Sequence, residues 1–166
     1  MSDNDIVLTV VDDPGIKAWL NRAVEEPFRL EFVSRGDMTR VLRLLEATTA
    51  HLVLVEINEE EMDQSLAIIT ALTSARPWVT VITVCGYANQ ELLLQSMRAG
   101  ARDCFLAGND GAEIRDRLRR HQLVRSGHYG DETRSAVNNL TLVAGADPTV
   151  DTRFLTQGLA IGISQR

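Results

Sequence analysis

The sequence IVLTVVDDPGIKAWL at residues 6–20 places an apolar segment directly before a segment with helical spacing. Residues 6–11 are almost entirely apolar, which is typical of a β-strand that is buried on both faces. Ile16, Trp19 and Leu20 follow at the three- and four-residue spacing of one helix face. We therefore predict a strand followed by a helix that packs on the sheet.

The same alternation of an apolar run and a helical segment continues along the chain. The further apolar runs are residues 30–34, 52–57, 79–84 and 103–106. Continuous Val, Ile and Leu runs separated by helical segments indicate a parallel sheet with helices on both faces and right-handed crossovers. We predict an α/β fold with a doubly wound, five-stranded parallel sheet.

Composition narrows the possible functions. The chain has 166 residues, of which 45% are hydrophobic, as expected for one globular domain and a short extension. No apolar run approaches the roughly 20 residues that cross a bilayer, so we expect no membrane insertion. The net charge of -6 argues against generic nucleic-acid binding. The first five residues lack the positive charge of a secretory signal, which favours a cytoplasmic location.

The chain divides into three predicted segments. A domain over residues 1–125 precedes a polar linker over residues 126–139, and one strand and one helix follow over residues 140–166. A lone strand and helix cannot bury a core. This extension is therefore expected to pack on the first domain, to exchange with a partner chain, or to begin a further domain.

Acidic and small residues follow the predicted strands. They are Asp12, Asp13, Glu56, Cys85 and Ala107. In an open parallel sheet the functional residues gather at the carboxyl ends of the strands. Three carboxylates at this edge, from Asp12, Asp13 and Glu56, would bind Mg²⁺ weakly. The aspartates could instead cap the helix that follows them, and we expect no other cofactor.

This arrangement resembles the receiver domain of bacterial response regulators. The pair Asp12 and Asp13 stands where receivers hold a divalent cation, and AGARD at residues 99–103 is similar to the receiver pattern Ala-Gly-Ala-x-Asp/Glu. The resemblance covers residues 5–125. It implies a flavodoxin-like, CheY-like sheet in the order 2-1-3-4-5.

The departures from the receiver pattern affect its chemistry. Glu56 stands in place of the phosphoacceptor aspartate, Cys85 in place of the switch Thr or Ser, and Ala107 in place of the lysine. The charge of that lysine stabilises the transferring phosphoryl group, and such electrostatic stabilisation is commonly the largest catalytic contribution. The only lysine of this chain, Lys17, lies on the first predicted helix, so we expect no ammonium group opposite Glu56. The resemblance implies a pseudo-receiver without enzymatic activity; the alternative is a genuine response-regulator receiver in phosphorelay signalling.

The sequence LTLVAGADPTVDTRFLTQGLA at residues 140–160 resembles the opening of MinD/ParA-like ATPases. Its degenerate Walker A positions are Gly145, Asp147, Pro148, Asp151, Thr152 and Arg153. Proline removes an amide donor, and the aspartates repel phosphate, so we expect no ATP binding there. A flavin or nucleotide site on the first domain is disfavoured because the loop after the first strand is acidic.

A receiver-like domain, a linker and an ATPase opening occur in this order in the CpaE/TadZ family of pilus-assembly and localisation proteins, which the chain resembles. The resemblance implies an interaction, dimerisation or localisation module in Flp/tight-adherence pilus assembly. It implies protein partners, a homodimer, and recruitment to a membrane pilus machine. We expect the dimer contact on the fourth helix, fifth strand and fifth helix, where Leu92, Met97, Ile114 and Leu118 are candidates, or on the extension.

Two further groups of side chains have competing interpretations. Cys85 and Cys104 fall on strands that would be neighbours, and we interpret them as core residues rather than a redox pair. Four arginines lie between residues 115 and 120. We interpret them as a solvated helix face that pairs with Glu113 and Asp116, with an anion- or partner-binding face as the alternative.

Overall fold

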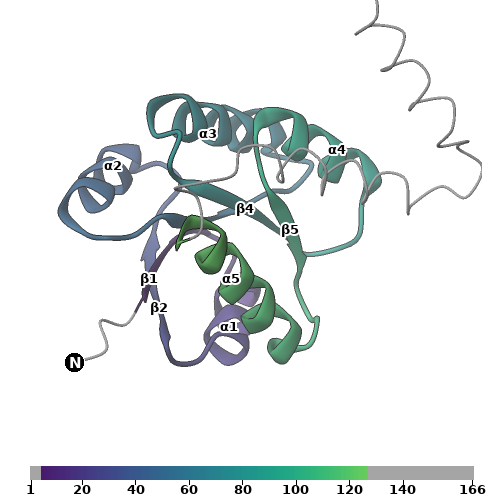
Figure 1. The fold of residues 1–166 in the computed structure, drawn as a ribbon. Coiled ribbons are helices and arrows are strands. Elements are labelled where there is room, and N and C mark those ends of the chain that lie inside the picture. Colours follow the sequence, from purple (N-terminus) through teal and green to yellow (C-terminus); the bar gives the residue numbers. More distant parts are fainter. Residues whose placement is uncertain (1–4, 127–166) are drawn as a thin grey trace, which may run out of the picture. The chain divides into compact units, whose positions relative to one another are not determined.

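The computed structural model describes residues 5–126, in which helices cover both faces of one parallel sheet (Figure 1). The elements are β1 (Asp5–Val10), α1 (Pro14–Ala23), β2 (Phe28–Val33), α2 (Met38–Ala47), β3 (Leu52–Glu56), α3 (Met62–Ala75), β4 (Thr80–Cys85), α4 (Gln90–Ala99), β5 (Asp103–Leu106) and α5 (Gly111–Ser126). The strand order is β2-β1-β3-β4-β5, and every pair is parallel. The predicted fold class and sheet order are confirmed.

Alternating side chains of each central strand belong to two separate cores. In β1, Val7 packs with residues of α1 and α5, whereas Leu8 packs with residues of α2 and α3. Figure 1 shows the same division, with α1 and α5 on one side of the sheet and α2, α3 and α4 on the other. Burial on both faces explains why these strands are almost entirely apolar.

Short polar side chains begin several helices. Asp13 accepts a hydrogen bond from the Ile16 amide (2.8 Å), and Asp37 accepts one from the Arg40 amide (3.0 Å). Helix α4 ends at Gly100, whose φ of 116° lies in the left-handed region. A Cβ at Gly100 would come within 2.9 Å of the Thr73 side chain, so both its conformation and its surroundings require glycine.

Three residues with core-like spacing are exposed. Leu93, Met97 and Leu123 are 42%, 44% and 69% exposed, although the helical spacing of Leu92, Leu93 and Met97, and of Ile114, Leu118 and Leu123, is typical of buried helix faces. Helix α4 buries only Leu92 and Ser96, because the cluster beneath it is small and consists of Ile57, Cys85 and Leu92 with partly buried neighbours. Of the four candidates for the dimer contact, Met97 is therefore exposed, whereas Leu92, Ile114 and Leu118 are buried.

The predicted strand and helix over residues 140–166, including the degenerate Walker A positions, lie outside the described residues. The expectations for Gly145 to Arg153 therefore stay predictions. Within residues 5–126, no helix is both long enough and apolar enough to cross a membrane.

Candidate functional site at the carboxyl edge of the sheet

Glu56 is the last residue of β3, and its side chain is only 4% exposed. One carboxylate oxygen, Oε2, accepts hydrogen bonds from the backbone amides of Asp12 (2.8 Å) and Asp13 (3.0 Å). The other oxygen, Oε1, accepts a hydrogen bond from Nδ2 of Asn58 (3.2 Å). The carboxylate therefore ties the loop after β1 to the end of β3.

Arg35 supplies the positive charge opposite Glu56. It lies in the loop between β2 and α2, and its side chain is only 2% exposed. Its Nη2 lies 3.1 Å from Glu56 Oε1, and its Nη1 donates a hydrogen bond to Glu61. Its backbone amide donates to Asp12 Oδ2 (3.2 Å), which also lies 3.9 Å from Nε. The Arg35 guanidinium thus forms ion pairs with three carboxylates, those of Asp12, Glu56 and Glu61.

Solvent exposure differs sharply among these carboxylates. The side chains of Asp12 and Glu61 are 43% and 52% exposed, so water screens much of their charge. Glu56 and Arg35 are buried, and removing the guanidinium would leave the Glu56 carboxylate in a medium that solvates it poorly. Nε and Nη2 of Arg35 make no hydrogen bond to a described residue. The Nη2–Oε1 contact is therefore an ion pair at short distance whose geometry does not make a hydrogen bond.

The three-carboxylate Mg²⁺ site expected from the sequence does not assemble. Asp13 caps α1, Asp12 faces Arg35, and both oxygens of Glu56 have protein partners. No three His, Cys, Asp or Glu side chains in residues 5–126 are grouped so that they could hold a metal ion. A guanidinium instead provides the cationic charge beside Glu56.

Cys85 and Ala107, the other two altered receiver positions, contact each other through the backbone. The Ala107 amide donates to the Cys85 carbonyl (2.8 Å). The Cys85 Sγ lies 3.7 Å from Cys104 Sγ. Cys85 is 7% exposed within the apolar cluster beneath α4, which agrees with its interpretation as a core residue.

The contact between the two thiols separates their acidities. A hydrogen bond from Cys85 lowers the pKa of Cys104 to about 7, against the opposing effect of burial. The same contact, together with burial, raises the pKa of Cys85. Because the thiolate is the nucleophile, we expect Cys104 to be the more reactive of the two cysteines.

Iodoacetamide should therefore alkylate Cys104 with a rate that rises around pH 7, whereas Cys85 stays unmodified in the folded chain. Mass spectrometry of peptides labelled over a pH series measures both sites. Cys85→Ala removes the hydrogen-bond donor and should move the Cys104 midpoint to higher pH. Equal labelling of both cysteines, or a midpoint that Cys85→Ala leaves unchanged, would contradict the described contact.

The arginines of α5 are largely engaged with acidic groups. Arg117 forms an ion pair with Asp103 of β5 and lies 4.8 Å from the centre of the Phe105 ring. Burial would raise the pKa of Asp103, but hydrogen bonds from His121 and Arg117 outweigh it and lower that pKa. Further ion pairs join Arg117 with Glu113, Arg119 with Asp116, and Arg115 with Glu25. The pairs with Glu113 and Asp116 agree with the predicted pairing, but Arg115 and Arg117 are only 25% and 22% exposed, so this face is solvated only in part.

Arg35 and Glu61 are the site residues that the sequence reasoning missed. The receiver pattern has a lysine as the cation opposite the acceptor, and the only lysine of this chain, Lys17, lies on α1. The one available signal was the position of Arg35 two residues after β2, because the carboxyl ends of parallel strands meet at one edge of the sheet.

The sheet order and the acid at the end of β3 define a receiver-like domain of the CheY class. The family model for the N-terminal region of the pilus assembly protein TadZ matches residues 1–129. The chain belongs to this family. Among curated proteins, none matches it.

Solved structures show the same fold. A CheY-like TadZ protein from Pseudomonas aeruginosa is 26% identical, with a TM-score of 0.66 over 70% of this chain and 98% of that one. A putative pilus assembly-related protein from Burkholderia pseudomallei is 21% identical, with a TM-score of 0.56 over 72% and 90%. A Thermotoga maritima response regulator is 20% identical, with a TM-score of 0.60 over 70% and 96%. The last two likenesses bear on the fold alone.

Proposed function

We propose that this chain is a non-enzymatic receiver-like module that acts through protein contacts in pilus assembly. The observation that carries the proposal is the buried ion pair of Arg35 and Glu56 at 3.1 Å. Phosphoryl transfer to a carboxylate requires an accessible oxygen and cationic groups that stabilise the transferring phosphate. Here the carboxylate oxygens are engaged by amides and a guanidinium, so the module needs neither a cofactor nor Mg²⁺.

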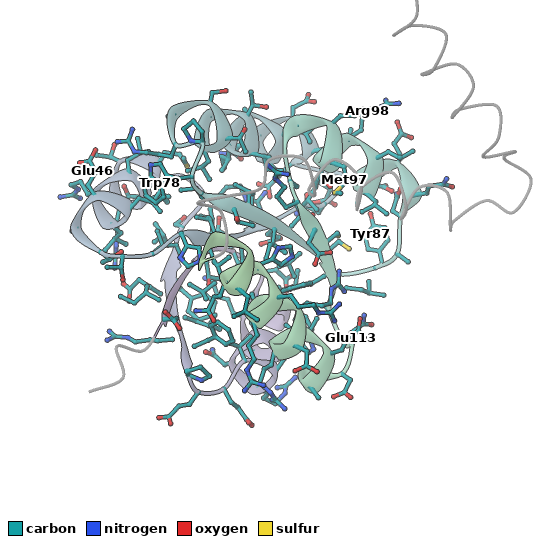
Figure 2. All side chains as sticks on the ribbon, viewed as in Figure 1. Glu46, Trp78, Tyr87, Met97, Arg98 and Glu113 are labelled. Atoms are coloured by element: carbon teal, nitrogen blue, oxygen red, sulfur yellow. The ribbon has the colours of Figure 1, made fainter. Side chains whose placement is uncertain are left out.

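The partner-binding role is supported by exposed apolar side chains at α4. Tyr87, Leu93, Leu94 and Met97 are each between 42% and 48% exposed. Met97 lies on α4, and Tyr87 lies in the loop before it (Figure 2). Grouped exposed apolar residues are typical of protein interaction surfaces. We propose protein partners, among them a second copy of this chain, a cytoplasmic location, and recruitment to the pilus machine through such contacts.

Complementation of a deletion strain tests this function. Deleting the gene that encodes this chain should abolish pili on the cell surface, and the unmodified gene should restore them. Glu56→Gln removes the acceptor carboxylate but leaves Arg35 beside Asp12 and Glu61, so it should also restore pili. Leu94→Asp places a charge in the exposed apolar face and should not.

Pili counted by electron microscopy, with protein levels checked by immunoblotting, give the result. Pili that persist after deletion would contradict the role in assembly. A Glu56→Gln protein that accumulates normally yet fails to restore pili would contradict the non-enzymatic mechanism, because acceptor chemistry would then be required.

A further inference from the structure

The exposed side of α4 has Leu94 near its centre. Successive residues of an α-helix are separated by about 100° around its axis, since there are about 3.6 residues per turn. Leu92 and Ser96 point into the protein, with 2% and 0% exposure, and Leu94 falls on the opposite side of the helix at 47%. The contact surface of α4 is therefore organised about Leu94.

The two flanks of this surface differ in chemistry. Leu93 and Met97 form an apolar flank on one side of Leu94. Glu91 and Arg98 lie on the other flank, where they line a shallow groove with Leu94. Within residues 5–126 neither Glu91 nor Arg98 has an ion-pair partner. Both charges are available to a partner, and Arg98 is labelled at the outer surface of α4 in Figure 2.

The two charges on this flank have opposite signs and lie on opposite sides of Leu94 along the helix. Glu91 lies three residues before Leu94 and Arg98 lies four residues after it. A two-fold axis perpendicular to two antiparallel helices keeps each flank facing its own copy and reverses the chain direction. Glu91 of one copy then meets Arg98 of the other, twice, and the apolar flanks of Leu93 and Met97 face each other. The surface is complementary to itself.

We propose that α4 pairs antiparallel with α4 of a second copy of this chain, about a two-fold axis near Leu94. The pairing rests on the proposed function, of which it specifies the dimer contact. Helix α4 has ten residues, so the interface is small, and the dimer is expected to dissociate reversibly on dilution. The cross-pairs favour the antiparallel direction, because a parallel two-fold arrangement would place Glu91 and Arg98 of each copy against the apolar flank of the other.

Charge reversal on the full chain tests the pairing. Glu91→Arg brings two arginines together at each cross-pair, and Arg98→Glu brings two glutamates together. Each single variant should raise the dimer dissociation constant at least about tenfold, because two repulsive pairs replace two attractive ones. The double variant Glu91→Arg with Arg98→Glu rebuilds both cross-pairs with reversed polarity and should recover the original dissociation constant to within about threefold.

Sedimentation equilibrium over a concentration series gives the dissociation constants. Arg43→Glu, an exposed charge reversal on α2, is the matched control and should leave dimerisation unchanged. Circular dichroism checks that each variant is folded.

Each result separates this pairing from the proposed function. A dimer unaffected by either single variant and by Leu94→Asp forms through another surface, which overturns the pairing but not the module. Two weakened single variants without recovery in the double variant would show that α4 contacts a different surface of the partner. A chain that is monomeric at every concentration would overturn both the pairing and the proposed homodimer.

Discussion

Replacing Arg35 with methionine should lower the free energy of unfolding by about 3–5 kcal/mol at neutral pH, because it leaves Glu56 buried without a compensating charge. Methionine retains much of the arginine stem and removes the guanidinium. Chemical denaturation with linear extrapolation measures the loss. The same substitution at the exposed Arg43 is the control and should change stability by less than about 0.5 kcal/mol.

A double-mutant cycle separates the charge from the packing of Arg35. Glu56→Gln alone should destabilise the chain less than Arg35→Met, because Asp12 and Glu61 still face the guanidinium. The double variant carries no unpaired buried charge at this position and should be more stable than Arg35→Met alone. Additivity to within about 0.5 kcal/mol would contradict the ion pair, and Arg35 would then act by packing.

Rebuilding the receiver chemistry should require four substitutions. Glu56→Asp, Cys85→Thr and Ala107→Lys together return the acceptor, the hydroxyl and the ammonium group of the receiver pattern. With Arg35 still in place, however, its guanidinium remains paired with the carboxylate at position 56, which would have to bind Mg²⁺ and accept the phosphoryl group. The triple variant should therefore show no change in its amide spectrum on addition of beryllofluoride and Mg²⁺. Adding Arg35→Ala should give a saturable response to beryllofluoride with Mg²⁺.

Amide NMR of each variant with and without beryllofluoride, which mimics a bound phosphoryl group, measures this response. The expected effect is strongly non-additive, because the groups act on one phosphoryl group. Glu56→Asp alone is the control and should not respond. A triple variant that responds fully with Arg35 present would show that the guanidinium is not the barrier.

The fold was predictable because the central strands β1, β3 and β4 are almost entirely apolar. Residues 52–57, for example, read LVLVEI, and Leu52 to Glu56 are buried without exception. Burial on both faces leaves no polar alternation, so the pattern indicates a parallel sheet directly. The spacing of apolar residues in α4 was less informative. The small core beneath the helix buries Leu92, whereas the apolar residues Leu93, Leu94 and Met97 are exposed.

The site was only partly predictable. Glu56 and Asp13 take positions that strand ends and capping rules indicate. Arg35 lies in a loop, and its burial depends on three carboxylates from separate parts of the chain. No local sequence pattern predicts that Asp12, Glu56 and Glu61 surround one arginine. The sequence therefore predicts the loss of phosphoryl transfer but not the identity of the cationic side chain beside Glu56.

Titration of the unmodified full chain with beryllofluoride and Mg²⁺, followed by amide NMR, tests the account most directly. The ion pair of Arg35 and Glu56 predicts that the amide resonances of Asp12, Glu56, Cys85 and α4 stay in place at saturating ligand. Saturable shifts that begin at Glu56 and extend into α4 would contradict it, because they would show a carboxylate open to a phosphoryl group and coupled to the distal surface.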